Sequence, residues 1–410
     1  MLDIKFIREN PEKIKEACQK KNTICDVDGF LHLDKKKREL IVKTENLKSE
    51  QNKLGKNEIE QAKKIKNEIK QVEPELQELE KKLSKLLSQF PNIPFDDVHV
   101  GKDESENIVL RKVGKMQKFN FQPKDYMTLG DNLDVIDTER AGKVAGSRFG
   151  YIKNDLVILE FALVNLAMEV ARKRGFVPLV PPVMLKEEMA KGTGYFEAGD
   201  EKEAYFLPED KLYLAGTSEQ PVVAMHSGEV LEEKDLPLRY ISFSTCFRRE
   251  AGSYGKDTKG ILRVHQFDKV ELVIFSKQED SQKEHELLLS IEEELMKKLE
   301  IQYQVINICT GDLGRPAARK YDIESWLPSE NKYRETHSAS NCTDFQARRL
   351  NIRYKDKSGK MNFVHTLNGT AFAIGRILII ILENYQQKDG SVKVPKVLQK
   401  YTGFKIIKSK

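Results

Sequence analysis

The residues best suited to chemistry in this 410-residue chain gather in one stretch, FRREAGSYGKDTKGILRVHQFDKVE at 247–271. Two adjacent cations, Arg248 and Arg249, are followed at once by Glu250, and the aromatic Phe267 comes near the end. Guanidinium groups suit phosphates, whereas an acid and an aromatic ring suit a base. The pattern therefore predicts a nucleotide site.

The same stretch predicts its own scaffold, two strands at 238–247 and 261–275 joined by a loop at 251–260. Arg248 and Glu250 are two residues apart, and alternate positions of a strand point to the same face. An arginine on that face can bind a phosphate through two parallel hydrogen bonds. A surface salt bridge between the two side chains explains the pattern as well, so both interpretations stay open. We expect the loop to move when a ligand arrives.

A second polar block, NKYRETHSASNCTDFQARR at 331–349, is flanked by residues predicted to belong to the core. Polar groups at this density inside a domain usually line a site, although a solvated loop is the alternative. Glu335 and Ser338 can supply oxygen ligands to Mg²⁺, which prefers carboxylates and phosphates. The block therefore predicts a metal position near the nucleotide.

Two further motifs carry single functional groups. Arg376 is the cation of a very apolar predicted helix within HTLNGTAFAIGRILIIILENYQ, and a buried unpaired charge is costly, so it requires a carboxylate or a bound phosphate. The segment LAGTSEQP places Thr217 and Glu219 on one face of an extended segment. Together a hydroxyl and a carboxylate can recognise an ammonium or hydroxyl group of a small substrate.

Composition excludes several classes of protein. The five cysteines form no CxxC pair, which disfavours a disulfide framework and a zinc knuckle and favours a reduced, cytoplasmic compartment. The N-terminus lacks the apolar run of a signal peptide, and the longest apolar stretch, 377–382, is too short to span a membrane. No P-loop, GxGxxG, GxSxG or HExxH motif occurs. A nucleotide must be bound by some other device.

The elements that position these groups differ along the chain. Residues 30–90 are rich in Lys, Glu, Gln and Leu and predict an antiparallel coiled-coil hairpin with a turn at 54–58 and a kink at Pro74. The clearest seam alternates steps of three and four residues through Ala62, Ile65, Ile69, Val72, Leu76, Leu79, Leu83 and Leu86.

From about Asn120 the pattern changes to strands with intervening helices and no βαβ repeat. Helices are expected at 156–174 and 281–299, and the proline-containing segment 176–182 suits an edge strand. The predicted class is therefore α+β, an antiparallel sheet flanked by helices behind an N-terminal helical hairpin.

Taken in order, the blocks resemble the bacterial-type seryl-tRNA synthetase family, class II aminoacyl-tRNA synthetases. The resemblance covers nearly the whole chain. It includes MLDIKFIRENPEKIKEAC, VKTENLKSEQNK, PNIPFDDVHVGKDESEN, TSEQP, the 247–271 stretch, YDIESWLP, YRETHSASNCTDFQARR and TLNGTAFAIGRILIIILENYQ. It implies a tRNA-binding domain at 1–103, with the arm at about 30–90, and a catalytic domain at 104–410.

The resemblance also implies roles for individual residues. Arg248 and Arg376 are implied as catalytic, and Glu335 and Ser338 as the Mg²⁺ position. The implied ATP-binding set is Arg248, Arg249, Glu250, Val264, Phe267, Glu335, Thr336, His337, Ser338 and Arg376. The implied L-serine-binding set is Thr217, Ser218, Glu219, Arg248, Glu271, Asn368 and Thr370.

The implied activity is ATP-dependent formation of seryl-adenylate and transfer of the seryl group to tRNA(Ser), with tRNA(Sec) left open as a second acceptor. A homodimer is expected, with VPLVPPVML as its interface element. Two other functions stay open at this level: an amino-acid-activating relative that charges a carrier protein, and a non-catalytic binding relative.

Overall fold

The computed structural model describes residues 1–55, 58–196, 200–251 and 259–409. The chain divides into two compact units, Met1–Ile93 and Pro94–Lys410. Parts of the expected turn and of the expected mobile loop, residues 56–57 and 252–258, lie outside the described residues. Among the helices that the structure describes, none combines the length and apolarity needed to cross a membrane.

Within its described residues, the first unit consists of four helices, α1 (Ile4–Glu9), α2 (Pro11–Lys20), α3 (Val27–Lys53) and α4 (Ile59–Gln89). Local sequence signals start the first two. The Asp3 side chain accepts hydrogen bonds from backbone N–H groups in the first turn of α1, and Pro11 opens α2, where no backbone donor is needed.

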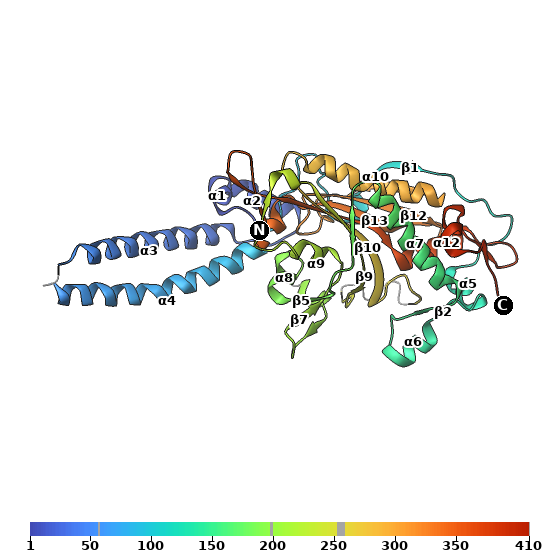
Figure 1. The fold of residues 1–410 in the computed structure, drawn as a ribbon, viewed down its shortest axis with the longest axis horizontal. Coiled ribbons are helices and arrows are strands. Elements are labelled where there is room, and N and C mark those ends of the chain that lie inside the picture. Colours follow the sequence, from blue (N-terminus) through green and yellow to red (C-terminus); the bar gives the residue numbers. More distant parts are fainter. Residues whose placement is uncertain (56–57, 197–199, 252–258, 410) are drawn as a thin grey trace. The chain divides into compact units, whose positions relative to one another are not determined.

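Helices α3 and α4 form the predicted hairpin and run side by side in Figure 1. Ion pairs join them, with Lys36 Nζ 2.7 Å from Glu75 Oε1. The seam prediction is confirmed along most of α4, although near its end Leu87 is buried and Leu86 is only half-buried. The helix continues through Pro74, and the kink expected there stays a prediction.

The expectation of no disulfide is wrong. Cys18, near the end of α2, and Cys25, just before α3, are joined, with their Cα atoms 6.3 Å apart. The pair encloses a short turn rather than a CxxC spacing, which is why the spacing of the cysteines gave no signal. The three other cysteines are buried and are not part of this disulfide.

Among its described residues, the second unit is built on an eight-stranded sheet in the order β1-β11-β12-β13-β16-β10-β9-β4. Neighbouring strands are antiparallel apart from the edge strand β4, which is parallel to β9, so the predicted α+β class is confirmed. The strands are β1 (Ile108–Val113), β4 (Val177–Leu179), β9 (Leu238–Phe247), β10 (Gln266–Ser276), β11 (Tyr303–Asn307), β12 (Arg319–Leu327), β13 (Lys332–Asn341) and β16 (His365–Ala373).

Smaller sheets and helices surround this sheet. The described helices are α5 (Tyr126–Asn132), α6 (Thr138–Ala145), α7 (Asp155–Arg172), α8 (Glu187–Gly192), α9 (Glu219–Ala224), α10 (Ser281–Leu299), α11 (Phe345–Leu350), α12 (Ile374–Asn384) and α13 (Gln399–Thr402). Two of the small sheets have two strands each: β2 (Ile136–Asp137) with β3 (Tyr151–Ile152), and β17 (Val392–Lys393) with β18 (Ile406–Ile407). Another consists of β5 (Met184–Lys186), β7 (Leu212–Leu214) and β6 (Phe206–Leu207). A further one consists of β15 (Met361–Phe363), β14 (Arg353–Lys355) and β8 (Val230–Glu232).

Strand β10 shows how the sheet separates core from site. Val270 and Leu272 are fully buried in one apolar cluster with residues of α7 and α10. Phe267, Lys269 and Glu271 alternate with them and line a cavity. Because successive strand residues point to opposite faces, the helices cover one face and the site occupies the other.

Helix α10 holds an unusual group against that sheet. Glu292 is fully buried, and neither carboxylate oxygen has a hydrogen-bond partner among the described residues. A Cβ atom at Gly369 of β16 would lie 2.9 Å from Glu292 Oε1, so the glycine lets this carboxyl lie close to the strand backbone. Burial raises the pKa of Glu292 well above its usual value and so favours the neutral carboxyl in the fold.

We expect Glu292→Met to stabilise the second unit by about 1–3 kcal/mol at pH 7, because the variant buries no unsatisfied polar group. The folded carboxyl keeps a proton that the unfolded one loses above its usual pKa. Wild-type stability therefore falls as pH rises from that value, and the gap between the proteins should widen from pH 5 to pH 8. Urea titrations followed by fluorescence of Trp326, the single tryptophan, measure this.

The matched control is Glu293→Met at the adjacent position. Glu293 accepts hydrogen bonds from Arg111 at 2.7 Å and from the Tyr303 hydroxyl at 2.9 Å. Its replacement should destabilise the fold. Equal losses of stability in both variants would contradict the assignment of Glu292 as an unsatisfied group.

Candidate active site

A cavity of about 610 Å³ opens on the free face of the sheet. It gathers side chains from all the sequence blocks that predicted chemistry. Its lining includes Tyr195, Thr217, Glu219, Arg248, Glu250, Val264, Phe267, Lys269, Glu271, Lys320, Glu335, Thr336, His337, Ser338, Asn368, Thr370 and Arg376. The cavity has two chemically different parts: one contains the arginines Arg248 and Arg376, and the other contains the buried acids Glu219 and Glu271.

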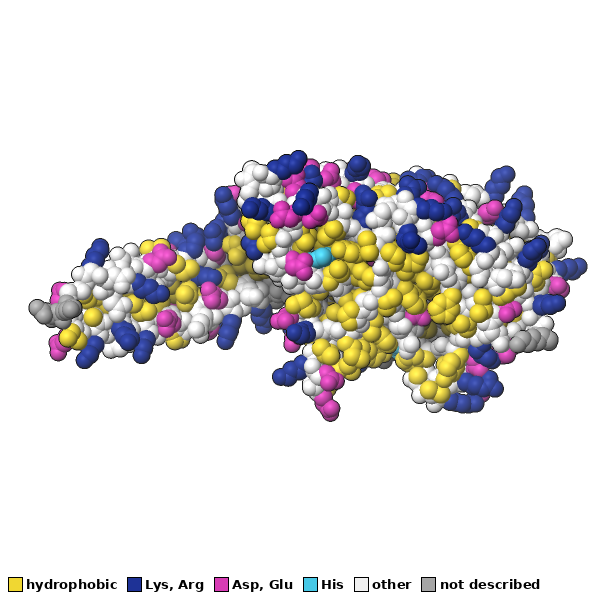
Figure 2. All heavy atoms as spheres, in the orientation of Figure 1, with side chains coloured by type: hydrophobic (Ala, Val, Ile, Leu, Met, Phe, Trp, Pro, Cys, Tyr) yellow, Lys and Arg dark blue, Asp and Glu magenta, His cyan; other side chains and the backbone are white. Residues whose placement is uncertain are grey.

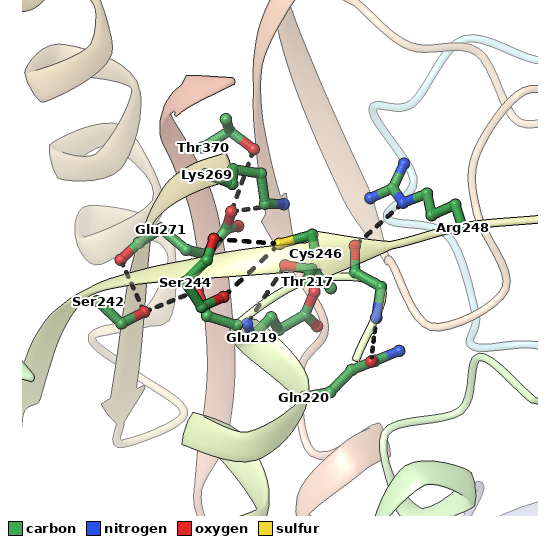
Figure 3. A network of polar contacts seen from close by, with 12 residues as sticks. Thr217, Glu219, Gln220, Ser242, Ser244, Cys246, Arg248, Lys269, Glu271 and Thr370 are labelled. Carbon is green, nitrogen blue, oxygen red and sulfur yellow. Dashed lines mark hydrogen bonds and ion pairs between the residues drawn. The ribbon is translucent and has the colours of Figure 1, made fainter. Parts of the chain in front are cut away.

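Arg248 lies just past the end of β9. Its Nε donates a hydrogen bond to the carbonyl of Gly216 at 3.0 Å, and its guanidinium carbon lies 5.3 Å from the centre of the Phe267 ring. Figure 3 shows the side chain extending from the strand end toward that carbonyl. This anchoring leaves further N–H groups of the fork able to bind an anion.

The structure corrects the geometry predicted for Glu250. It does not share a strand face with Arg248, because β9 ends at Phe247 and Glu250 has a positive φ of 53°. The β10 strand also begins at Gln266 and not at residue 261. Glu250 still reaches the cavity, where its Oε2 lies 2.9 Å from Arg263 Nη1.

A second charged group forms where β13 meets α12. Arg376 Nη1 lies 3.2 Å from Glu335 Oε2 and donates to the Glu335 carbonyl at 3.0 Å. Burial opposes ionisation of Glu335, but Arg376 and Lys320 more than offset it and hold its pKa at about 2. Arg376 is therefore half-buried beside an ionised carboxylate that is itself partly exposed at the cavity, and this carboxylate is one of the two anions that the sequence predicted for it.

Directly after Glu335, β13 carries two buried residues that line the cavity, Thr336 and His337. The Thr336 hydroxyl lies 2.8 Å from that of Ser325 and donates to the carbonyl of Ile323 at 3.2 Å. Burial lowers the pKa of His337 to about 3, so its imidazole is neutral. A register shift between Ile323 and Glu324 of the neighbouring strand accommodates this part of β13.

The other part of the cavity holds buried acids, and Figure 3 shows several of its groups pointing toward one another. Lys269 Nζ lies 2.6 Å from Glu271 Oε2, and the Thr370 hydroxyl donates to the same oxygen at 3.3 Å. Lys269 and Glu271 are both almost fully buried. A buried cation and carboxylate so close stabilise each other's charge.

The TSEQP segment folds differently from its prediction. It is not extended: Ser218 has helical backbone angles and Glu219 begins α9. Glu219 is buried and accepts hydrogen bonds from Tyr195 and Gln346. Thr217 lines the cavity. Ser218 does not: its hydroxyl accepts a hydrogen bond from the Ser242 hydroxyl, with 2.8 Å between the two oxygens.

Of the predicted site residues, all but two line the cavity. The exceptions are Ser218 and Arg249, whose guanidinium lies 5.8 Å from the Tyr205 ring centre. The cavity is also lined by Lys269, Tyr195 and Lys320, which were not predicted from the sequence. Lys269 precedes Glu271 by two residues, so strand alternation could have revealed it. Tyr195 and Lys320 carry no local signal.

Residues 205–385 match the family model of the tRNA synthetase class II core domain (G, H, P, S and T), and residues 1–94 match that of the seryl-tRNA synthetase N-terminal domain. The sequence is 44% identical to the serine–tRNA ligase of Dictyoglomus turgidum, with 100% of both chains covered.

Solved structures agree. Seryl-tRNA synthetase from Pyrococcus horikoshii complexed with ATP superposes with a TM-score of 0.93 at 42% identity, covering 100% of both chains. Cytoplasmic serine–tRNA ligase from Naegleria fowleri in complex with AMP gives 0.90 at 35% identity, covering 100% of this chain and 99% of that one.

The antiparallel sheet, with a polar cavity on its open face, is the core of a class II aminoacyl-tRNA synthetase. Within that class, the chain belongs to the seryl-tRNA synthetase family. The resemblance inferred from the sequence motifs is thereby confirmed.

Proposed function

We propose that this protein activates L-serine with ATP and transfers the seryl group to tRNA(Ser). A carboxylate oxygen of serine attacks the α-phosphorus, the bond to the β-phosphate oxygen breaks, and seryl-adenylate and pyrophosphate form. A hydroxyl at the 3′ end of the tRNA then attacks the seryl carbonyl carbon and releases AMP. One observation supports this proposal most directly. In a chain of this family, one cavity holds both the arginines suited to phosphates and the buried acids suited to an amino acid.

Both attacking groups belong to substrates, so the protein needs no nucleophile and catalysis rests on positioning and charge stabilisation. In this proposal Arg248 offsets the charge that develops at the α-phosphate, and Arg376 holds the leaving pyrophosphate. Phe267 stacks on adenine, with Glu250 and the backbone at Val264 near the base. Arg249, Thr336 and His337 complete the proposed ATP set, although Arg249 stands away from the cavity lining.

The proposed L-serine pocket consists of Thr217, Ser218, Glu219, Arg248, Glu271, Asn368 and Thr370. Its selectivity follows from polarity. Thr370 and Glu271 can bond the serine hydroxyl, and Glu271 also accepts a hydrogen bond from Thr370 at 3.3 Å and pairs with Lys269. A pocket built to bond a hydroxyl strongly rejects an analogue that lacks one, such as alanine.

Mg²⁺ is proposed at Glu335 and Ser338. The residues fit a hard cation, because Glu335 is ionised and its side chain is 46% exposed at the cavity. Within the described residues no group of three or more His, Cys, Asp or Glu could hold a metal. The ion would therefore take its other ligands from phosphate oxygens and water, and when bound it neutralises phosphate charge.

The tRNA partner is assigned to the domain at 1–103 and to its arm. Residues 35–85 carry 15 Lys or Arg against 10 Asp or Glu, a basic excess that suits the phosphates of an RNA helix. The catalytic domain is proposed at 104–410. Charging of tRNA(Sec) stays open and is tested by adding that tRNA to the charging assay.

A homodimer in the cytoplasm is the proposed working form. Large apolar side chains stand exposed on α7, β4 and the following segment, among them Phe161 at 53% and Val180 at 79% exposure. Figure 2 shows hydrophobic side chains gathered on the viewed face of the larger unit. Patches of this kind mark interaction surfaces, and light scattering that finds a monomer would contradict the dimer.

The function is tested by ATP–pyrophosphate exchange with serine, threonine and alanine in parallel. We expect exchange with serine, little with threonine or alanine, and loss of exchange when EDTA removes Mg²⁺. Absence of exchange with any amino acid would refute the proposal. Aminoacylation of a tRNA pool then separates a tRNA ligase from a relative that charges a carrier protein.

A further inference from the structure

A set of hydrogen-bond donors surrounds the buried carboxylate of Glu219, the first residue of α9, which is 2% exposed. The Tyr195 hydroxyl lies 3.1 Å from Glu219 Oε2 and 3.3 Å from Oε1. The Gln346 side-chain amide donates to Oε1 at 2.8 Å. Tyr195 lies in the loop after α8 and Gln346 on α11, so two separate elements hold one carboxylate.

The orientation of the Gln346 amide is itself determined. A carboxylate only accepts, so the Nε2 end must face Glu219. The same Nε2 donates to the carbonyl of Thr193 at 3.1 Å, and the Oε1 end accepts from the Thr366 hydroxyl of β16 at 2.6 Å. Every polar atom of this amide therefore has a partner, and the network is rigid.

The surroundings of Glu219 shift its pKa in opposite directions. Burial raises the pKa of Glu219 to about 7, and the hydrogen bond from Gln346 acts against it. Glu271 across the cavity raises it further, whereas Lys269 and the Tyr195 hydroxyl lower it. Burial and the nearby carboxylates also raise the pKa of Tyr195, so the phenol stays protonated and donates.

We propose that Tyr195 and Gln346 are positioning residues that keep the Glu219 carboxylate ionised and aimed into the cavity, where it receives the ammonium group of the amino acid substrate. This inference rests on the proposed function and assigns a role to two residues outside the predicted serine set. A buried neutral acid would attract no ammonium, so the donors that favour the anion govern substrate affinity.

One consequence is that serine and a proton compete at Glu219. Ionisation increases as pH rises through about 7, so the apparent affinity for serine should increase over the same range. ATP binds at the arginine end of the cavity, and its KM should not follow this titration. A merely structural role for the network would move both KM values together.

The test uses the full-length enzyme with Tyr195→Phe, which removes one hydroxyl. We expect the KM for serine in pyrophosphate exchange to rise about tenfold at pH 7, with the KM for ATP unchanged. The acid limb of the kcat/KM profile for serine should move up by about one pH unit, and the deficit should shrink by pH 9.

Two further variants serve as a control and as an independent test of the network. Tyr213→Phe makes the same change on a ring that stacks on the neighbouring Phe196, at 5.4 Å between centroids, and should leave the serine profile unaltered. Thr366→Val removes the donor that orients Gln346 and should shift the profile in the same direction by a smaller amount.

The inference is overturned if Tyr195→Phe leaves the KM for serine and the pH profile unchanged, or raises both KM values equally. It is also overturned if Tyr213→Phe produces the same shift as Tyr195→Phe. Wild-type enzyme without serine-dependent exchange would refute the proposed function itself, which is a different outcome from normal exchange with an unaffected variant.

Discussion

Replacing Arg248 by alanine is expected to lower serine-dependent pyrophosphate exchange about a thousandfold or more while the fold stays intact. The residue lies beyond the end of β9, anchored by a 3.0 Å hydrogen bond to Gly216, with its guanidinium against Phe267. That anchoring fixes a planar fork at the cavity before ligand binds, so no reorganisation is needed as charge develops on the phosphate. Steady-state exchange and circular dichroism together measure the loss.

Arg248→Lys and Arg249→Ala sharpen this prediction. Lysine keeps the charge but not the fork, so we expect partial activity well below wild type. Arg249 directs its guanidinium toward Tyr205 and outside the cavity lining, so its loss should cost much less than that of Arg248. Near-normal exchange in Arg248→Ala would refute the role assigned to Arg248.

Shortening the arm is expected to separate the two half-reactions. Removing residues 43–69 and closing the helices with a short Gly-Ser linker should reduce tRNA charging at least about a hundredfold while leaving pyrophosphate exchange within about twofold, because the removed basic surface serves only the tRNA. The residues that hold the base of the hairpin remain. Asp34 still pairs with Arg8 at 2.8 Å, and Lys36 with Glu75 at 2.7 Å.

The measurement compares charging and exchange on the same preparation. Charging of the full-length enzyme should also weaken with added salt, and the shortened enzyme should show a flatter salt dependence because it contacts fewer phosphates. Equal losses of exchange and charging would contradict the proposed division of labour between the two domains. A matched control replaces the removed segment by one of equal length with neutral exposed positions.

The helices and strands were largely readable from the sequence because their signals are local. Helix α10 has the predicted bounds, Ser281–Leu299, and strand β9 the predicted bounds, Leu238–Phe247. The proline-containing strand β4 lies at the sheet edge, as the missing backbone donor requires. Failures came where backbone geometry is irregular, at the start of β10 and at Glu250, whose positive φ no spacing rule predicts.

The residue types of the site could also be predicted from the sequence, because cations, acids and hydroxyls grouped in polar blocks indicate a binding site. Their pairing could not. Arg376 and Glu335 are 41 residues apart, and Gln346 and Glu219 are 127 apart, yet each pair is in contact. Such contacts depend on strand order and on which loops converge over the sheet, and neither is recorded in a short motif.

The sequence by itself therefore determined the class of fold, the family and most residues that face the cavity. Only the tertiary structure decided which groups pair with the acids of the cavity: Thr370 with Glu271, Arg376 with Glu335, and the Tyr195 and Gln346 donors with Glu219. The physical reason is that burial makes an unpaired charge or polar group costly, so each acid requires partners, and distant parts of the chain supply them.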